Sequence, residues 1–512
     1  DSQHVAYVLR RFVEGDDRFH ATIHLRDLVT DEDLELTPGP GEHTQPVFSP
    51  DGQTLAFVSK RDDEGAQLCL LPLRGGEAHR LTSGIGGVSS PTWSPDGKRL
   101  AFARDVIVSA DYAARKGAKA SPKEAPPTGQ VYGLINEKSS AKVADALLFR
   151  HWDTWRDRRR KHVFLVDAHS GRTQDITPGD WDAPPLSLGS SRDFDFSPDG
   201  KELAFVANPD EIIARSTNNC IFLQPLAGLR PKGPPLCVSV TEACDSRPRY
   251  SPDGRFVFYL AMEEPGYEAD RNRIKAYDRE NGETTVFLAS FDRSPATYEL
   301  APGKADGNPT IVFSADDLGY HSLYRLDLDS DRVRQLTRGT TNGQLRVLSD
   351  GRLLVTREST TEPPDLFILD PTAGIPPLLA PAEAPPDSPA DAGCAASALT
   401  HERDALAGVE MRSAEAFWYP GAGNRPIHGF LVKPPGFSRR RRYPLILLIH
   451  GGPQGAFGDS FHYRWSAQLF ASQGACVAMI NPRGSTGYGQ RFKEQISKDW
   501  TGKVYDDLLK GV

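Results

Sequence analysis

The sequence predicts a β-propeller of seven blades that is followed by the opening of a doubly wound α/β sheet. Three observations predict this fold class: a tight-turn motif that recurs between strand-like segments, a change in composition near residue 393, and two continuous apolar segments after it that each run into a glycine-rich loop. Strand-only units that repeat about every 40–50 residues are typical of propeller blades. A strand, a loop, a helix and a second buried strand are typical of an α/β sheet.

The recurring turn reads Ser-Pro-Asp-Gly, and its four copies begin at Ser49, Ser94, Ser197 and Ser251. Proline presets φ at the second position of a type I turn, aspartate hydrogen-bonds nearby amides, and glycine suits the exit from the turn. The β-branched and aromatic residues on either side then pair as strands. These turns are therefore interpreted as scaffold, and none of their residues is given a chemical role.

Counting these turns predicts seven blades. Degenerate turns near Ala301 and Ser349 continue the period, and residues 5–37 form one more blade before the first copy. The long gap between the second and third copies is interpreted as one blade with an insertion around 104–143, because that segment lacks a turn signature. We therefore expect the propeller to occupy residues 1–393.

Residues 394–512 are expected to form the beginning of an α/β domain. The segment 371–395 is rich in Pro and Ala, which is typical of a linker. The apolar segments 443–449 and 475–480 have the pattern of parallel strands that are buried on both faces. Helices are expected at 466–473, 490–500 and 504–509.

The first buried strand runs into His450-Gly451-Gly452-Pro453. Sites in α/β folds are built at the C-terminal ends of strands, and glycines there let backbone N–H groups approach a substrate oxygen and stabilise an oxyanion. A tight turn without a chemical role accounts for the same residues. His450, Gly451 and Pro453 are expected to shape the loop, and His450 is expected to hold it rather than to act as a base.

A second glycine-rich loop, 484–489, follows the other buried strand. It lacks the Lys-Ser/Thr pair of a phosphate-binding loop and the spacing of a dinucleotide fingerprint. We therefore expect it to be structural.

Composition and charge exclude several function classes. Hydrophobic residues make up 38% and charged residues 25% of the chain, which suits a globular protein, and no apolar run is long enough for a membrane span. A net charge of −8 without a basic face argues against nucleic acid as a partner. The six cysteines are dispersed and contain no CxxC, so neither a disulfide framework nor a zinc site is expected. Free thiols and the lack of a visible secretory signal favour the cytoplasm.

Taken together, these motifs resemble the prolyl oligopeptidase family, in the bacterial members of its acylaminoacyl-peptidase-like branch. The resemblance rests on YPLILLIHGGPQG, NPRGSTGYGQ and DWTGKVYDDLLKGV after residue 443 and on RHWDTWRDRRRKHVFLVD at 150–167. It implies a β-propeller (seven blades) followed by the beginning of an α/β-hydrolase domain, with 394–512 as an incomplete N-terminal part of the catalytic domain. It also implies a serine peptidase that acts on short peptides with a Ser-Asp-His triad, without a metal or other cofactor, and with a propeller that filters substrates by size.

The resemblance assigns one catalytic group within the chain. Gly452, the second glycine of the motif, would supply a backbone N–H to the oxyanion hole. The nucleophile should lie in a Gly-x-Ser-x-Gly elbow, and the sequence contains no such pattern. The nucleophile, acid and base are therefore expected beyond residue 512, and the chain is expected to be a fragment, or the ordered part, of a longer enzyme. Ser485 lacks the elbow glycines and is not expected to replace the nucleophile.

Two alternatives to the peptidase are a non-catalytic propeller binding module with a degenerate hydrolase domain, and an esterase, which a large propeller makes less favoured. The sequence leaves open which end of a peptide is attacked, since an exopeptidase needs a charged group to hold a terminal amine or carboxylate. It also allows a homo-oligomer, and the insertion around 104–143 is a candidate gate or subunit contact.

Overall fold

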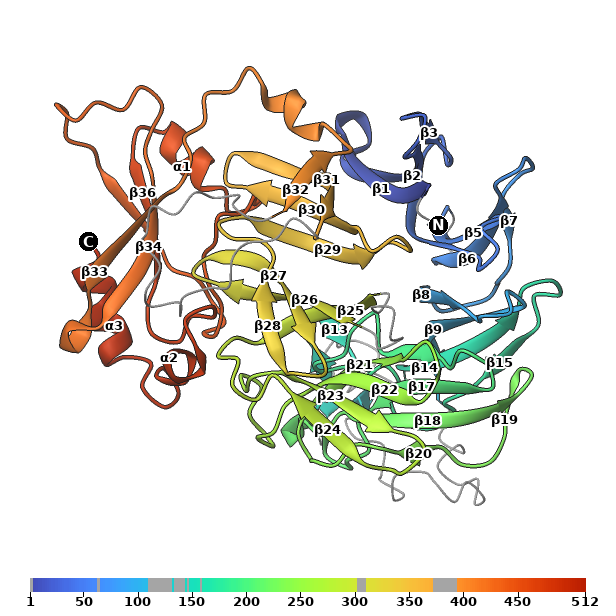
Figure 1. Cartoon of the computed structure of the whole chain (residues 1–512). Helices are drawn as coiled ribbons and strands as arrows, with labels where there is room; N and C mark the ends of the chain where they lie inside the picture. The colour runs from blue at the N-terminus through green and yellow to red at the C-terminus, as the bar shows by residue number, and fades with distance from the viewer. Residues whose placement is uncertain are drawn as a thin grey trace. The chain divides into compact units, whose positions relative to one another are not determined.

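The structure is a computed structural model of the chain, drawn as a ribbon in Figure 1. It describes residues 3–61, 65–108, 131–132, 143–144, 147–156, 159–301, 310–371 and 394–512. Most of the predicted insertion around 104–143 and nearly all of the predicted linker lie outside these residues. The chain divides into two compact units, Asp1–Glu268 with Ile274–Val286 and Ala269–Arg273 with Phe287–Val512.

The first unit is built from antiparallel strands in successive groups. The first two groups share one sheet, because β2 and β4 meet at a single parallel bridge between Ala21 and Glu42. They comprise β1 (His4–Val13), β2 (Arg18–Asp27) and β3 (Asp33–Glu35), then β4 (Glu42–Phe48), β5 (Thr54–Lys60), β6 (Gln67–Pro72) and β7 (His79–Arg80).

Three further sheets follow, each in a meandering or nearly meandering order. They comprise β8 (Val88–Trp93), β9 (Arg99–Ile107), β14 (Arg159–Asp167) and β15 (Thr173–Asp175); β16 (Phe194–Phe196), β17 (Glu202–Ala207), β18 (Cys220–Ala227), β19 (Arg230–Pro231) and β20 (Leu236–Cys237); and β21 (Asp245–Tyr250), β22 (Phe256–Ala261), β23 (Arg273–Asp278) and β24 (Thr284–Phe287). Between β9 and β14 lie two short hairpins, β10 (Val131–Tyr132) with β11 (Val143–Ala144) and β12 (Arg150–His151) with β13 (Thr154–Trp155).

The predicted turns join the first two strands of these groups, and the copy at Ser94 shows their chemistry. Its hydroxyl donates to Asp96 Oδ1 at 2.6 Å and accepts from the Arg99 N–H at 3.0 Å, while the Gly97 N–H donates to the Ser94 carbonyl at 2.9 Å. Gly97 has φ +67°, a conformation that glycine adopts without strain. The hydrogen bonds of this turn thus join residues that are at most five positions apart.

The core of the first unit lies between neighbouring sheets. One cluster joins Val58 and Leu68 of the second group to Phe102 of the third, and another joins Leu165 of the third to Phe205 of the fourth. Sheets that bury both faces against their neighbours are the packing that the repeat predicts. The second, third and fourth groups of this unit are therefore each held by apolar contacts on two sides.

The second unit contains two more four-stranded antiparallel sheets and a four-stranded mixed sheet. The antiparallel sheets comprise β25 (Pro295–Ala301), β26 (Thr310–Asp317), β27 (Tyr320–Asp327) and β28 (Arg332–Gln335), then β29 (Thr341–Val347), β30 (Leu353–Ser359), β31 (Glu362–Asp370) and β32 (Ala395–Ala398). The described residues thus hold seven groups of antiparallel strands before the mixed sheet, in agreement with the predicted number of blades.

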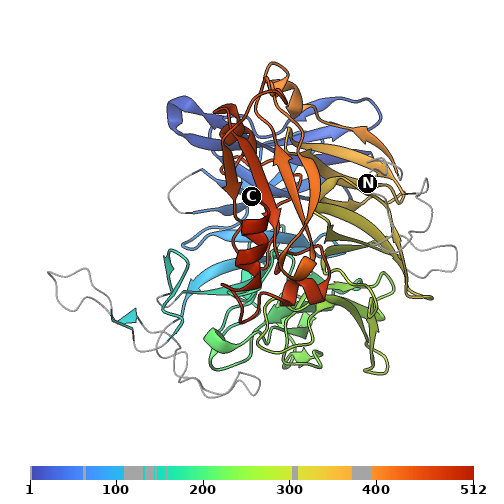
Figure 2. The same ribbon diagram turned by 90° about the vertical axis from the view of Figure 1, so that its left-hand side faces the viewer.

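The mixed sheet has the order β33-β34-β36-β35, with β36 and β35 parallel. Its elements are β33 (Glu415–Pro420), β34 (Pro426–Val432), β35 (Leu445–Leu448) and β36 (Cys476–Asn481), with helices α1 (Ala467–Ser472), α2 (Gln490–Glu494) and α3 (Lys503–Lys510). Both predicted parallel strands form. Helix α3 lies against the strand β33 (Figure 2), and α2 ends at Glu494, six residues before the predicted end, in a series of turns.

One expectation about this sheet is wrong in the structure. The strand β35 was predicted to be buried on both faces, but Leu445 is 41% exposed and Ile449, just beyond its end, is 60% exposed. The reason is that β35 pairs only with β36 among the described strands and so forms the edge of the sheet.

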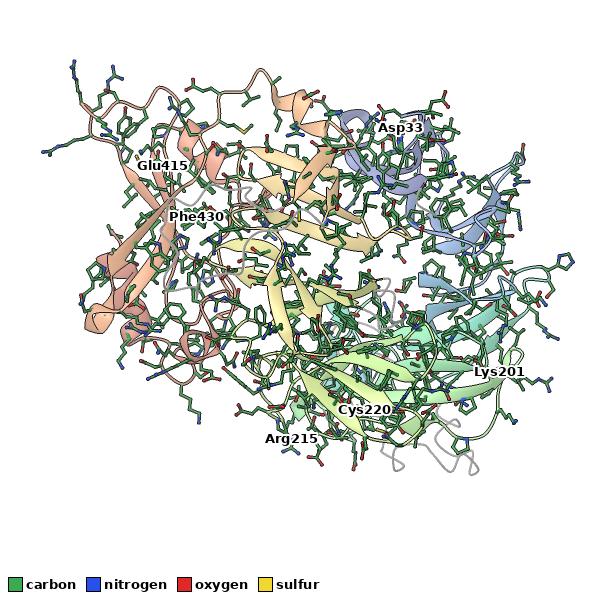
Figure 3. The ribbon with its side chains drawn as sticks, in the orientation of Figure 1. Asp33, Lys201, Arg215, Cys220, Glu415 and Phe430 are labelled. Atoms are coloured by element: carbon green, nitrogen blue, oxygen red, sulfur yellow. The ribbon has the colours of Figure 1, made fainter. Side chains whose placement is uncertain are left out.

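The mixed sheet packs against the β26–β27 hairpin of the same unit. The buried Phe430 of β34, labelled in Figure 3, meets the Tyr320 ring edge-on at a centroid distance of 5.9 Å. At the hairpin turn, a Cβ added to Gly319 would come within 2.5 Å of the Phe430 ring. Glycine at this turn therefore permits the close approach that brings the hairpin beside the loops of the mixed sheet.

Among the described residues, no helix is both long and apolar enough to cross a membrane.

Candidate functional site

The motif residues His450 to Pro453 form the loop that leaves the C-terminal end of β35. Gly452 has φ +133°, and a Cβ at this position would lie 2.6 Å from the Gln454 nitrogen, so only glycine fits without distortion. Gly451 and Gly452 are both exposed. Within the described part of the chain, no group accepts a hydrogen bond from the Gly452 N–H. This N–H is thus a donor that a ligand oxygen can reach.

The His450 ring lies inside the loop and holds its backbone. Its Nδ1 lies 2.9 Å from the Gly451 carbonyl oxygen, and its Nε2 lies 2.9 Å from Ser485 Oγ. The Phe457 ring packs edge-on against it at 5.6 Å. Burial lowers the pKa of His450, and the hydrogen bond with the Gly451 carbonyl offsets part of that effect.

The loop after β36 is bound to the loop after β35. The two strands are parallel, so both loops leave the same edge of the sheet. Asn481 donates from Nδ2 to the Phe457 carbonyl at 2.9 Å and accepts from the Phe457 N–H at 2.7 Å. The Thr486 N–H donates to the Gly455 carbonyl, also at 2.9 Å. The predicted structural role of the glycine-rich loop 484–489 is consistent with these contacts.

The same loop continues to the β26–β27 hairpin. The Thr486 hydroxyl donates to Asp316 Oδ2 at 2.8 Å, and the other carboxylate oxygen lies 2.8 Å from His321 Nδ1. The Leu318 N–H donates to the Gly487 carbonyl at 3.1 Å. Burial alone would raise the pKa of Asp316, but the hydrogen bond and positive charge of His321 outweigh it and hold the pKa below its usual range. Asp316 is therefore a carboxylate under neutral conditions.

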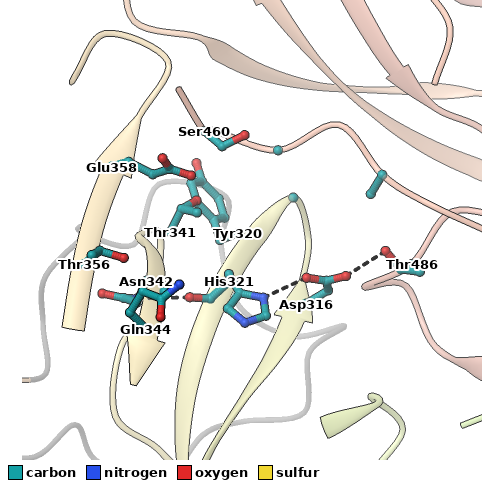
Figure 4. A pocket seen from close by; sticks show the side chains of 14 residues that line it. Asp316, Tyr320, His321, Thr341, Asn342, Gln344, Thr356, Glu358, Ser460 and Thr486 are labelled. Carbon is teal, nitrogen blue, oxygen red and sulfur yellow. Dashed lines mark hydrogen bonds and ion pairs between the residues drawn. The ribbon is translucent and has the colours of Figure 1, made fainter. Parts of the chain in front are cut away.

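A polar cavity of about 430 Å³ opens beside this hairpin (Figure 4). Its wall contains carboxylates, hydroxyls and amides, which include Asp316, Tyr320, His321, Thr341, Asn342, Gln344, Thr356, Glu358, Ser460 and Thr486. Burial first, and then repulsion from Asp459, raises the pKa of Glu358 to about 7. Two carboxyl groups and His321 thus line one partly open cavity, which suits a polar ligand with hydrogen-bond donors.

A second cavity, of about 520 Å³, lies on the motif loop and has an apolar wall that includes Leu447, Phe457, Trp465 and Met479 together with His450 and Gly451. Ala456, Gly458 and Ser460 line both cavities. The short segment 456–460 therefore has the candidate oxyanion loop on one side and the polar cavity on the other.

Sequence reasoning located the loop but missed its partners. Asp316, His321 and Glu358 lie in blade segments that were interpreted as scaffold, and the contact between Ser485 and His450 joins residues from two different loops. The Asp316-Asp317-Leu318-Gly319 turn joins the second and third strands of its blade, where the Ser-Pro-Asp-Gly pattern does not occur, so this pattern gave no signal for the site. Among the described residues, no group of three or more His, Cys, Asp or Glu side chains could hold a metal ion.

Comparison with known proteins agrees with this architecture. Residues 1–110 match the model of the TolB β-propeller domain, and residues 461–512 match the model of the prolyl oligopeptidase family. An acylaminoacyl peptidase solved in complex with Z-Gly-Gly-Phe-chloromethyl ketone aligns with a TM-score of 0.73 at 18% identity, over 100% of this chain and 68% of that one. The predicted class, a β-propeller followed by an α/β-hydrolase domain, is confirmed.

Two similar proteins are dipeptidyl-peptidases or probable dipeptidyl-peptidases. The chain is 28% identical over 393 residues to dipeptidyl-peptidase 5 of Schizosaccharomyces pombe, which covers 74% of this chain and 53% of that protein. It is 31% identical over 396 residues to a probable dipeptidyl-peptidase 5 of Emericella nidulans, which covers 73% and 51%. The chain spans about half the length of these relatives. The match of residues 461–512 to the prolyl oligopeptidase family and the similarity to these peptidases agree with the resemblance that the sequence predicts.

Proposed function

We propose that the whole protein is a serine peptidase that hydrolyses short peptides, and that it releases dipeptides from a free N-terminus. One observation carries the proposal. The loop that presents the accessible Gly452 N–H borders one cavity, and the segment 456–460 lines both this cavity and the polar cavity, which contains two carboxyl groups. The relatives named dipeptidyl-peptidase support the second part, since that reaction requires recognition of a terminal ammonium group.

In the proposed reaction a serine hydroxyl attacks the peptide carbonyl, a histidine accepts the proton and returns it to the leaving amine, and an aspartate orients that histidine. We propose that these three residues lie outside positions 1–512. The Gly452 N–H donates to the oxyanion of the tetrahedral intermediate, and loss of one such donor costs roughly 3–4 kcal/mol. His450, Gly451 and Pro453 shape the loop that presents this donor.

The polar cavity is proposed to bind the substrate ammonium group. Asp316 carries a negative charge, and an ammonium group beside Glu358 would lower the pKa of that carboxyl from about 7 and favour its charged form. Tyr320, Asn342 and Gln344 add hydrogen-bond acceptors in the same wall. An acetylated N-terminus has neither the charge nor the donors for this site.

We further propose that residues 1–393, as the sequence predicts, form the propeller together with the strand β32 (Ala395–Ala398), which pairs with β31, and that the rest of 394–512 forms the first part of the catalytic domain. The propeller would admit short peptides and exclude folded proteins. All six cysteines are free, which is compatible with the reducing cytoplasm as the site of action. The insertion around 104–143 as a gate or subunit contact, and the homo-oligomer, stay predictions.

The test uses the full-length protein with a fluorophosphonate probe and two matched fluorogenic dipeptidyl amides, one with a free amine and one N-acetylated. We expect one labelled serine and a clear preference for the free amine. A preference for the acetylated substrate would favour an acylaminoacyl peptidase, and cleavage of esters alone would favour an esterase. A full-length protein without a labelled serine would support the non-catalytic binding module.

A further inference from the structure

The segment 456–460 lies between the two cavities, and Asp459 joins this segment to the blades. Ala456, Gly458 and Ser460 line both cavities, and the Asp459 side chain contacts the blade residue Thr360. Ser460 can be followed in the wall of the polar cavity in Figure 4. The position of this segment therefore determines the shape of the wall that the two cavities share.

The backbone of Asp459 is hydrogen-bonded to two blades. Its N–H donates to the Gly319 carbonyl at 2.9 Å, in the turn between β26 and β27, and its carbonyl accepts from the Thr341 hydroxyl at 2.7 Å, at the start of β29. A Cβ added to Gly458 would lie 2.7 Å from the Gly319 carbonyl oxygen, so the segment lies closely against this turn. These contacts use backbone atoms of residue 459 and do not depend on its side chain.

The carboxylate of Asp459 adds two hydrogen bonds from a third place on the blades, the turn between β30 and β31. Its Oδ1 accepts from the Thr360 N–H at 2.8 Å and from the Thr360 hydroxyl at 2.9 Å. Thr360 is buried, and hydrogen bonds to a carboxylate are stronger than those between neutral groups. The side chain therefore fixes the segment to the end of β30, the strand that carries Glu358.

In the proposed function the two cavities hold two parts of one substrate. The ammonium group binds beside Glu358, and the carbonyl that is attacked binds at the Gly452 N–H. The spacing between these two points determines which peptide bond reaches the oxyanion donor. A segment that lines both cavities and is bonded to the strand of Glu358 can keep this spacing constant.

We propose that Asp459 is a positioning residue whose carboxylate holds the segment 456–460 against the β30–β31 turn, and that the resulting fixed spacing selects the release of dipeptides over longer fragments. The inference rests on the proposed function and adds a residue that determines specificity to the same site. Asp459 acts through the segment and does not contact the substrate.

Two substitutions of Asp459 separate its hydrogen bonds from its charge. Asp459→Asn keeps an oxygen that can accept from both Thr360 donors, Asp459→Ala removes this acceptor, and both substitutions remove the charge. Loss of the charge removes the repulsion that raises the pKa of Glu358, so at pH 8, above the wild-type value of about 7, Glu358 is mainly charged in all three proteins. A difference between the two variants at pH 8 therefore reports the hydrogen bonds.

The experiment measures kcat and KM of the full-length proteins at pH 8 for two matched fluorogenic amides with a free amine, one dipeptidyl and one tripeptidyl. We expect Asp459→Ala to lower the preference for the dipeptidyl amide, as a ratio of kcat/KM values, about tenfold or more, since a small displacement of a positioned group has effects of this size. Asp459→Asn should restore the ratio to nearly the wild-type value, and the exposed control Asp404→Ala should leave it unchanged. Loss of stability alone lowers both rates equally and does not change this ratio. A wild-type ratio in Asp459→Ala, or an equal loss in both Asp459 variants, would overturn the proposal.

Thr360→Val tests the same contact from the blade and keeps the test decisive where Asp459→Ala folds poorly. Valine keeps the backbone N–H and the shape of threonine but lacks the hydroxyl, so we expect a smaller loss of the preference than in Asp459→Ala. An unchanged preference in Thr360→Val would contradict the proposal. In the Asp459→Ala background Thr360→Val should cost little more, because the acceptor is already absent, and full additivity of the two losses would contradict the mechanism.

Failure of this inference and failure of the proposed function give different results. A wild type that has no labelled serine, or that does not prefer the dipeptidyl amide, would overturn the proposed function and this inference with it. A wild-type preference that both Asp459→Ala and Thr360→Val retain would overturn this inference alone.

Discussion

Ser94 and Ser485 are both fully buried serines in turns that contain glycine, but their hydroxyls have different kinds of partner. The hydroxyl of Ser94 contacts Asp96 and Arg99, two and five residues away. That of Ser485 contacts His450, 35 residues away, and the adjacent Thr486 contacts Asp316, 170 residues away. The first turn is a self-contained element of one blade, whereas the second joins three segments that meet only in the folded protein. Changes in the two regions should therefore differ in kind, with loss of stability in one and loss of catalysis in the other.

The largest effect is expected at Gly452. An alanine there must adopt φ near +133° and place its Cβ 2.6 Å from the Gln454 nitrogen, so the loop has to move. We expect Gly452→Ala to lower kcat of the full-length enzyme by about a hundredfold or more, as loss of an oxyanion donor does. Gly408→Ala is the control, because its added Cβ meets nothing within 4 Å. Wild-type kcat in Gly452→Ala would exclude a role for this N–H.

A smaller effect on substrate binding is expected at Glu358. Removal of its charge in Glu358→Gln should raise KM for the free-amine dipeptidyl substrate about tenfold, which corresponds to about 1.4 kcal/mol of binding free energy. KM for the acetylated substrate should change little. The wild type should bind the free amine more tightly as the pH rises through about 7, the pKa of Glu358. An equal change in Glu362→Gln, on the exposed side of the neighbouring strand, would argue against a specific site.

The same substitution, Glu358→Gln, should weaken substrate binding but stabilise the folded protein above pH 7. The folded protein raises the pKa of Glu358 from 4.5 to about 7, so the carboxyl supports the folded state fully below pH 4.5 and loses that contribution as the pH rises through 7. Glutamine is neutral throughout, and we expect Glu358→Gln to raise the thermal midpoint at pH 8 but not at pH 4. The gain should be about 1–2 kcal/mol, because the side chain is partly solvated. A lower midpoint at pH 8 would contradict the assigned burial penalty.

The smallest effect is expected at Ser94. Ser94→Ala removes two hydrogen bonds of one blade turn and should reduce the free energy of unfolding by about 1–2 kcal/mol. The kcat of the folded enzyme should stay at the wild-type value, since the partners of the Ser94 hydroxyl, Asp96 and Arg99, lie in the same blade. Thermal unfolding and kcat measured on one sample separate the two quantities. A loss of kcat without loss of stability in Ser94→Ala would contradict the distinction between a stabilising turn at Ser94 and a catalytic region at Ser485.

The sequence alone predicted the blade turns, their period, the parallel strands and the loop at Gly452, because each depends on residues that are neighbours in the chain. Proline, aspartate and glycine at fixed offsets determine a turn, and an apolar run followed by His-Gly-Gly-Pro determines a strand with a loop at its end. Gly452 was singled out by the resemblance to the prolyl oligopeptidase family, and the structure gives it a positive φ that glycine adopts without strain. The exposed edge at β35 could not be predicted from the sequence, because the exposure of a strand depends on which strands pair beside it.

Only the tertiary structure decided what surrounds that loop. Ser485, Asp316 and Glu358 have no unusual local pattern, and their chemistry comes from contacts across long stretches of chain. The raised pKa of Glu358 arises from burial and from Asp459, two effects that exist only when the segment 456–460 packs on the blades. Hydrogen bonds and desolvation depend on distance in space, and sequence reports distance only where neighbours along the chain are also neighbours in the fold. The sequence by itself therefore determined the scaffold and the loop at Gly452, while the folded chain decided which side chains contact that loop and which charges lie near it.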